Sequence, residues 1–264
     1  MANLFLEHRF KFADDKLDIT PGVAVTYFSD FKFHAFPGLD VGYQFSENLK
    51  VYGNLGVTYR IPTYTDLYYN DPGTIGNENL EPEEAFAQEI GLKYNSGRFT
   101  TSVAIFNRDA TDLIDFIREN TTISKFTATN IAKVNTKGFE ANADYHFKLK
   151  DFKQTLSVGY TFLEDDILEQ NKDLSRYSLN TLKHQFITRF ASRLFKNVRQ
   201  NIIYKHAERT VGTSYNVWDA SIIVDFNKFS FTATASNIFD ADYIESGFVP
   251  MPPSNVLFGL RYAF

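Results

Sequence analysis

Asn-Val-Leu-Phe-Gly-Leu-Arg-Tyr-Ala-Phe, residues 255–264, is the stretch that decides the fold class of this chain. Its alternate residues are all apolar or aromatic: Val256, Phe258, Leu260, Tyr262 and Phe264. Successive side chains of a strand point to opposite faces, so the pattern predicts a strand with one apolar face. An ending within such a strand is typical of a closed sheet, in which the last strand pairs with an earlier one and leaves no free edge.

The same alternation recurs along the whole sequence. Thirteen stretches are predicted to be strands: residues 2–13, 18–28, 32–45, 49–60, 84–94, 98–117, 134–147, 153–164, 185–195, 198–208, 214–226, 229–239 and 255–264. Several of them clearly separate an apolar register from a polar one, as residues 214–226 illustrate. There the apolar register is Trp218, Ala220, Ile222, Val224 and Phe226, and the polar register includes Asp219, Ser221 and Asp225. We therefore expect an all-β protein with one apolar face and one hydrated face.

Alternation alone fits either a transmembrane β-barrel or a soluble β-sandwich, and three features favour the barrel. Most of the stretches reach about ten residues, which crosses a bilayer obliquely, whereas sandwich strands cluster at roughly five or six. Short turns, such as residues 46–48 and 95–97, alternate with mostly longer connections, such as residues 61–83 and 240–254. That alternation is typical of short periplasmic turns and long extracellular loops. Aromatic residues also recur at strand ends, where they suit the level of the lipid headgroups.

Composition excludes several other classes of protein. The 264 residues include 27 Phe and 15 Tyr, and they hold no run of 18 apolar residues that could form a membrane helix. Cysteine is absent, which excludes disulfides, thiolate metal sites and thiol catalysis. The net charge of −5 offers no basic patch for nucleic acid. Residues 1–12 alternate as a strand and lack the core of a signal peptide, so a cell-surface location requires sequence upstream of Met1.

From Tyr59 onward the sequence resembles the C-terminal part of the barrel of TonB-dependent outer-membrane receptors. The resemblance is carried by Tyr59-Arg-Ile-Pro-Thr-Tyr-Thr-Asp-Leu-Tyr-Tyr69, Gly76-Asn-Glu-Asn-Leu-Glu-Pro-Glu83 and Gln88-Glu-Ile-Gly-Leu-Lys-Tyr94. Further matches are Asn135-Thr-Lys-Gly-Phe-Glu140, Ser236-Asn-Ile-Phe-Asp-Ala-Asp-Tyr243 and Phe258-Gly-Leu-Arg-Tyr-Ala-Phe264. The family usually has a Pro-Gly-Arg-like step before its last strand, where this sequence has Pro252-Pro-Ser-Asn255.

The resemblance implies an architecture and a function. Residues 1–264 would form the C-terminal portion of the barrel, about 13 of an expected 22 strands, with the N-terminal plug domain and the other part of the wall absent. The parent protein would be a receptor in the outer membrane of a Gram-negative bacterium, surrounded by lipid. It would take up a scarce nutrient, such as cobalamin or an iron-siderophore complex, with energy from the TonB complex acting through the plug. The alternative is a passive porin-like or structural barrel.

Six residues of the first long loop and of the rim beside it are candidates for ligand binding: Arg60, Tyr64, Asp66, Tyr68, Tyr69 and Asn77. The tyrosines offer broad amphipathic surfaces, which either contact a ligand or pack the loop against the rim. Pro62 cannot donate to a strand ladder, so we expect pairing to end there. Gly76 and Asn77 suit a turn. Glu81, Glu83 and Glu84 are expected to be solvated rim charges rather than metal ligands.

No catalytic residue, metal site or cofactor is predicted. The acidic stretch 164–169 lacks the spacing of a calcium loop and reads as a surface loop, and the five histidines show no zinc spacing. His206 and Asp219, on neighbouring predicted strands, are the sole pair that suggests hydrolysis, and no Gly-x-Ser-x-Gly elbow accompanies them. We therefore expect that the protein is not an enzyme.

Overall fold

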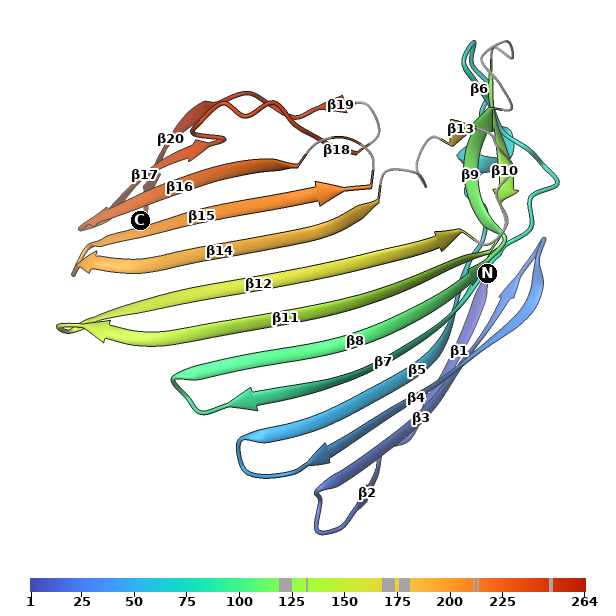
Figure 1. The fold of residues 1–264 in the computed structure, drawn as a ribbon, viewed down its shortest axis with the longest axis horizontal. Coiled ribbons are helices and arrows are strands. Elements are labelled where there is room, and N and C mark those ends of the chain that lie inside the picture. Colours follow the sequence, from blue (N-terminus) through green and yellow to red (C-terminus); the bar gives the residue numbers. More distant parts are fainter. Residues whose placement is uncertain are drawn as a thin grey trace. The chain divides into compact units, whose positions relative to one another are not determined.

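Long strands make up most of the molecule (Figure 1). The computed structural model describes residues 1–118, 125–131, 133–167, 174–175, 181–210, 212, 214–246 and 249–264. The first half contains β1 (Ala2–Glu7), β2 (Phe10–Phe12), β3 (Leu17–Phe28), β4 (Lys32–Gln44), β5 (Leu49–Arg60), α1 (Tyr64–Tyr68), β6 (Thr74–Ile75), β7 (Glu83–Asn95), β8 (Phe99–Thr111), β9 (Leu113–Arg118) and β10 (Phe126–Ile131). The second half contains β11 (Val134–Leu149), β12 (Phe152–Ile167), β13 (Leu174–Ser175), β14 (Leu182–Phe195), β15 (Val198–Arg209), β16 (Tyr215–Phe226), β17 (Phe229–Ser236), β18 (Ile244–Ser246), β19 (Val249–Pro250) and β20 (Asn255–Tyr262). Among the described residues, no helix has the length and apolar character needed to cross a membrane.

The main sheet places its long strands in the order in which they occur along the chain. Within the described residues the order is β1-β3-β4-β5-β7-β8-β11-β12-β14-β15-β16-β17-β20, and β2 also pairs with β3. Each of the thirteen predicted stretches overlaps one strand of this path, and residues 49–60 match β5 at both ends. The predicted antiparallel all-β fold is therefore confirmed. The short turns after β4, β7, β14 and β16 also occur at the predicted positions.

Two predicted strands are interrupted. The prediction of one strand over residues 98–117 is wrong, because Asp112 adopts a φ of 55° and separates β8 from β9, which joins a different sheet. Residues 2–13 form β1 and β2, which pair with β3 in one continuous register. The interruption falls at His8, whose N–H donates to the carbonyl of Pro21, because Pro21 has no N–H to return the bond.

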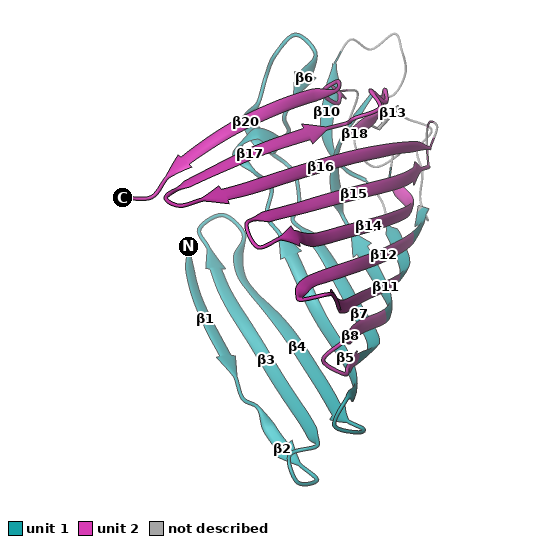
Figure 2. Ribbon diagram, turned by 90° about the vertical axis from the view of Figure 1, so that its left-hand side faces the viewer, with its two compact units in different colours: residues 1–93, 104–139, 163–181 teal, residues 94–103, 140–162, 182–264 magenta. Residues whose placement is uncertain are grey.

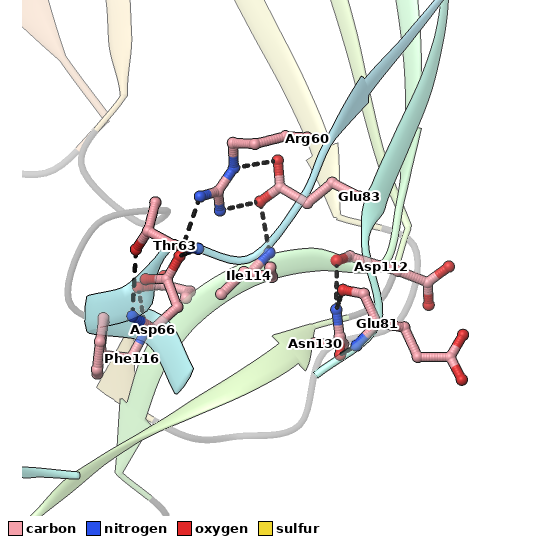
Figure 3. Close-up of polar contacts among 10 residues, drawn as sticks. Arg60, Thr63, Asp66, Glu81, Glu83, Asp112, Ile114, Phe116 and Asn130 are labelled. Atoms are coloured by element: carbon pink, nitrogen blue, oxygen red, sulfur yellow. Dashed lines mark hydrogen bonds and ion pairs between the residues drawn. The ribbon is translucent and has the colours of Figure 1, made fainter. Parts of the chain in front are cut away.

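The chain divides into two compact units (Figure 2). The first comprises residues 1–93, 104–139 and 163–181, and it includes a small sheet with the order β13-β9-β10-β6. The second comprises residues 94–103, 140–162 and 182–264, and it includes β14 to β20. In the first unit, β6, β9 and β10 lie beside α1 near the residues where β5 ends and β7 begins (Figures 1 and 3).

The two registers of the second unit lie on opposite faces of its sheet. Ile222 pairs with Ala233 and Ala233 with Phe258, so the apolar side chains of three neighbouring strands share one face. Large side chains on this face are exposed: Trp218, Ile222, Phe226, Phe229, Phe231, Phe258, Leu260 and Tyr262. The polar registers of β11, β12 and β14 instead line a hollow of about 600 Å³, with Glu140, Asn142, Asp144, Gln185 and Arg189 among its lining residues. An exposed apolar face of this extent requires lipid or a partner to cover it.

Candidate functional site

A capping box fixes the start of α1, directly after β5. The hydroxyl of Thr63 accepts a hydrogen bond from the main-chain N–H of Asp66 at 3.2 Å, and the Asp66 carboxylate accepts one from the main-chain N–H of Thr63 at 2.8 Å. This reciprocal pair satisfies two donors that a helix start leaves free. The Thr-x-x-Asp spacing is visible in the sequence, so this signal could have predicted a helix within the segment expected to be a loop.

Arg60, the last residue of β5, joins the cap to β7. Its Nε atom lies 2.8 Å from Glu83 Oε2 and its Nη2 atom lies 2.5 Å from Glu83 Oε1, so the guanidinium and the carboxylate form a bidentate pair. Its Nη1 atom lies 3.2 Å from Asp66 Oδ2. Bidentate pairing of arginine with a carboxylate is stronger and more directional than a single hydrogen bond. One guanidinium thereby connects the end of β5, the cap of α1 and the start of β7.

Glu83 also binds β9. Its Oε1 atom accepts a hydrogen bond of 2.7 Å from the main-chain N–H of Ile114, and the glutamate is only 7% exposed (Figure 3). The prediction that Glu83 is a solvated rim charge is therefore wrong, because its carboxylate is enclosed by partners from other elements. Its neighbour Glu84 is exposed, as expected. No local signal in the sequence marks the difference, since Arg60 and Ile114 lie 23 and 31 residues away.

Residues 61–82 and the hairpin of β9 and β10 form one folded region, which we call the two-loop body. Asn130 donates to the carbonyl of Glu81 and accepts from its N–H, both at 2.8 Å, and donates to the carbonyl of Asp112 at 2.7 Å (Figure 3). β10 pairs in parallel with β6. A small apolar core lies between the two segments, made of Leu80, Ile114, Phe116 and Ala128, with Leu67 and Phe126 against it.

The motif residues Gly76 and Asn77 are part of this body. A Cβ atom on Gly76 would lie 2.7 Å from the carbonyl carbon and oxygen of Leu67, so only glycine allows the loop to pass so close to α1. Asn77 donates through Nδ2 to the carbonyl of Ala128 at 3.2 Å and accepts from the N–H of Asn79 at 3.0 Å. The turn itself is displaced from the predicted position: the N–H of Leu80 donates to the carbonyl of Asn77 at 3.4 Å, so Asn77 begins the turn and Gly76 precedes it.

The tyrosines lie on the exposed side of α1. Tyr64 is 79% exposed and Tyr68 is 49% exposed, and their ring centroids are 4.9 Å apart. Tyr69 is also exposed, and its hydroxyl donates to Asp71 at 2.9 Å. The six predicted site residues therefore fall into two groups. Arg60, Asp66 and Asn77 hold the loop, whereas the three tyrosines present an aromatic surface, and ligand contact by any of the six stays a prediction.

The family motif at residues 236–243 forms a comparable junction in the second unit. Asn237 is 3% exposed, has a φ of 50° and directly follows β17. Its N–H donates to Asp219 Oδ1 at 2.8 Å, its side-chain amide donates to the carbonyls of Ala241 and Pro252, and its side-chain oxygen accepts from the N–H of Ala241. One asparagine thus connects the end of a strand to both sides of the following loop.

An ion pair holds the next part of the same loop. Lys205 of β15 pairs with Glu245 of β18, and the Tyr215 hydroxyl donates to Glu245 at 3.1 Å. The Lys205 ammonium lies 5.6 and 5.3 Å from the ring centroids of Tyr215 and Tyr243, and those two rings are 4.7 Å apart. The lysine therefore combines an ion pair with two cation–π contacts.

The remaining candidates take part in other contacts. His206 Nδ1 lies 2.9 Å from Asn216 Oδ1, and Asp219 accepts from Asn237, so each member of the pair considered for hydrolysis has another partner. The acidic stretch 164–169 lies partly outside the described residues, and within it Asp165 accepts from Thr136 Oγ1 at 2.5 Å. Among the residues that the structure describes, no group of three or more acidic or histidine side chains could hold a metal ion.

Comparison with known proteins identifies the family. The model of the family described as "TonB dependent receptor-like, beta-barrel" matches residues 2–238. This chain belongs to the TonB-dependent receptor β-barrel family. The resemblance to this family is thereby confirmed, and the motif residues Arg60, Asp66, Gly76, Glu83 and Asn237 have structural roles in this chain.

A curated protein and two solved structures are similar to this chain. The chain is 24% identical over 221 residues to the Vitamin B12 transporter BtuB of Photobacterium profundum, and the match covers 78% of the chain and 34% of that protein. It superposes on the siderophore receptor PirA of Acinetobacter baumannii with a TM-score of 0.77 and 16% identity, over 99% of the chain and 45% of the receptor. The copper transporter OprC gives a TM-score of 0.73 at 16% identity, over 99% of the chain and 47% of that protein. The chain thus spans less than half the length of each of these three proteins.

Proposed function

We propose that this chain supplies wall strands and extracellular loops of an outer-membrane receptor that imports a scarce nutrient with energy from the TonB complex. Family membership supports the class of protein, and the exposed apolar face of β16, β17 and β20 supports a lipid environment. The partners would be outer-membrane lipid, a plug domain that fills the barrel, and the TonB complex acting through that plug. The location would be the outer membrane of a Gram-negative bacterium.

We further propose that the exposed tyrosine surface of α1 contacts the nutrient. The observation that carries this proposal is that Tyr64 and Tyr68 remain exposed while the cap beneath them is fixed by three hydrogen bonds among Thr63, Asp66 and Arg60. Rigid aromatic side chains bind ligands at low cost in conformational entropy. Arg60, Asp66 and Asn77 would contribute to binding by holding this surface, and cobalamin and iron-siderophore complexes are the candidate ligand classes.

Binding measurements test the tyrosine surface directly. The receptor, produced from its native coding sequence, would be titrated with cyanocobalamin and with ferric enterobactin. Replacing Tyr64 and Tyr68 together by alanine should weaken binding of the recognised compound about tenfold or more. Tyr94→Ala, at an exposed residue where β7 ends, is the matched control and should bind normally. Unchanged affinity in the double variant would remove the tyrosines from the site, and failure of both compounds to bind would remove these two ligand classes.

A passive porin-like barrel is the competing function. It predicts a steady open conductance in planar bilayers, because no plug would fill the channel. A receptor of the proposed type should show little conductance at rest. A steady open conductance of the purified protein would contradict the proposal.

A further inference from the structure

Glu83 occupies the one point at which β5, α1, β7 and β9 are connected through charged side chains in the described part of the molecule. Its two oxygens receive three hydrogen bonds, two from Arg60 and one from the N–H of Ile114. The carboxylate is buried, so each of these donors replaces water that the group would otherwise bind. Oε1 receives two of these bonds, whereas Oε2 receives the third from Arg60, so loss of the Arg60 contact takes away the donor to Oε2 at a buried carboxylate.

The apolar contacts of the two-loop body are few. Its core consists of four buried residues and two partly buried ones, and such a small core gives limited stability by itself. β6, the strand through which residues 61–82 pair with the hairpin, has only two residues. Polar contacts therefore carry much of the connection between residues 61–82 and β9–β10. Those of Glu83 and Asn130 act together with the bonds of Asn77 to Ala128, Phe126 to Gly73 and Lys125 to Asn70.

The charges at this point do not balance locally. Arg60 is the cation within reach of two carboxylates, those of Glu83 and Asp66, among the described residues. The guanidinium binds Glu83 through two short hydrogen bonds and Asp66 through a single longer hydrogen bond of 3.2 Å. Glu83 thus fixes the position of Arg60, and Arg60 in turn contacts the carboxylate that caps α1. A change at Glu83 reaches the tyrosine helix through these contacts.

We propose that Glu83 is a positioning residue, which locks residues 61–82 and the β9–β10 hairpin into one rigid body and so fixes the tyrosine surface of α1. The role rests on the proposed function and extends it, since Glu83 acts on the ligand surface without contacting the ligand. The two loops would move together, and the affinity for the nutrient would depend on a residue at the base of the body. Glu83→Gln is the sharpest test variant, because the amide oxygen can still accept from Ile114 while the charge that holds Arg60 is lost.

Hydrogen exchange of the purified receptor, measured by mass spectrometry, tests without any ligand whether Glu83 holds residues 61–82 and the β9–β10 hairpin together. Glu83→Gln should speed exchange on the order of tenfold or more in residues 61–82 and in β9–β10 together, and should leave β15 and β16 unchanged. Glu84→Gln makes the same change in charge at the next, exposed position and should exchange like the natural protein. Faster exchange in only one of the two loops, or in neither, would overturn the proposal.

A disulfide across the two loops supplies a rescue. Ile75 of β6 and Thr127 of β10 are paired neighbours, and neighbouring strands lie about 4.8 Å apart, which suits a disulfide. The chain has no cysteine of its own, so Ile75→Cys and Thr127→Cys can pair only with each other within it. In the Glu83→Gln background the oxidised disulfide should restore slow exchange in both loops, and its reduction should abolish the rescue. Loops that remain fast after oxidation would show that Glu83 does not act by joining them.

Measuring the binding of cyanocobalamin and ferric enterobactin tests whether the positioning role of Glu83 affects ligand affinity. Whichever compound the natural protein binds should bind at least several-fold more weakly to Glu83→Gln, and the oxidised disulfide should restore the affinity. A loss of affinity that the disulfide does not restore would mean that Glu83 contacts the ligand or the plug, which contradicts a positioning role. If neither compound binds the natural protein, the ligand assignment fails, while the exchange measurements still decide whether Glu83 joins residues 61–82 to β9–β10.

Discussion

The ring of Phe106 on β8 lies over the backbone of Gly138 on β11, in the space that a Cβ atom on residue 138 would occupy. No side chain fits at residue 138 while the ring stays in place. The glycine of the family motif Asn135-Thr-Lys-Gly-Phe-Glu140 is thus explained by the Phe106 ring, which packs against its backbone, rather than by a turn.

Gly138→Val should destabilise the strand pair β8–β11 by about 1–3 kcal/mol, because the ring must leave its position. Thermal unfolding in detergent checks the change. Adding Phe106→Ala should recover part of the loss, and Gly56→Ala should have little effect, since the nearest atom to its Cβ would be 4.0 Å away. A valine at residue 138 that leaves the unfolding temperature unchanged would contradict the steric explanation.

Asn237→Ala should release the loop that follows β17. The change removes three side-chain hydrogen bonds and places alanine at a φ of 50°. Together these losses cost about 2–4 kcal/mol of local stability. Hydrogen exchange in residues 238–243 should rise accordingly. Asn255→Ala loses one exposed side-chain bond and serves as the control. The interpretation fails if both variants exchange alike.

Ile222→Arg should impair insertion into the outer membrane, whereas Ser221→Arg should be far milder. Ile222 lies on the exposed apolar face and Ser221 on the opposite one, so the two variants place the same charge on different sides of β16. An arginine facing lipid at the bilayer midplane costs about 2–4 kcal/mol. The amount of folded protein in isolated outer membranes is the measurement. Equal yields of the two variants would contradict the assignment of the apolar face to lipid.

The contact of Lys205 with Glu245 should weaken in acid. Partial burial alone would raise the pKa of the Glu245 carboxyl, but the hydrogen bond and charge of Lys205 outweigh this and hold the pKa below its ordinary value of 4.5. The Tyr215 hydroxyl and the charge of Arg209 act in the same direction. Since the folded pKa is depressed, the stabilisation is fully present above pH 4.5 and is lost as the pH falls through the folded value.

Protease accessibility of the loop containing Glu245 should therefore rise as the pH falls below about 4.5, with no change from about pH 7 to pH 5. Glu245→Gln removes the titrating group and should show equal accessibility across the range, apart from the protease's own pH dependence. That dependence is read from an unstructured peptide of the same sequence. A natural protein whose loop behaves like the Glu245→Gln variant at every pH would exclude this role for the ion pair.

The strands were predictable because their signal is local. A period of two over ten or more residues identifies a strand whatever its partners, and β5 was located to the residue at both ends. Short elements carry no comparable signal. α1 has five residues, too few to display a period of 3.6, and only its cap at Thr63 and Asp66 marked it. The break at Asp112 depends on one left-handed residue, which the surrounding apolar alternation concealed.

The candidate site was predictable only in part, because its polar contacts join distant parts of the chain. Tyr64 and Tyr68 lie on the surface, and ligand contact by them stays a prediction. The sequence marks Arg60 but not its partner, since nothing near Glu83 in the sequence distinguishes it from the exposed Glu84. Burial of a carboxylate follows from what the fold brings beside it, and the donors at Arg60 and Ile114 become neighbours only after β5, β7 and β9 have assembled.

The residues that form the cap of α1 are not the residues that form its exposed surface. Thr63 and Asp66 form the cap, whereas Tyr64 and Tyr68 contribute no side chain to it. Substitutions at the two outward positions can therefore change the chemistry of the surface without rebuilding its support. A library randomised at residues 64 and 68 alone should yield many folded variants that differ in the chemistry of this surface.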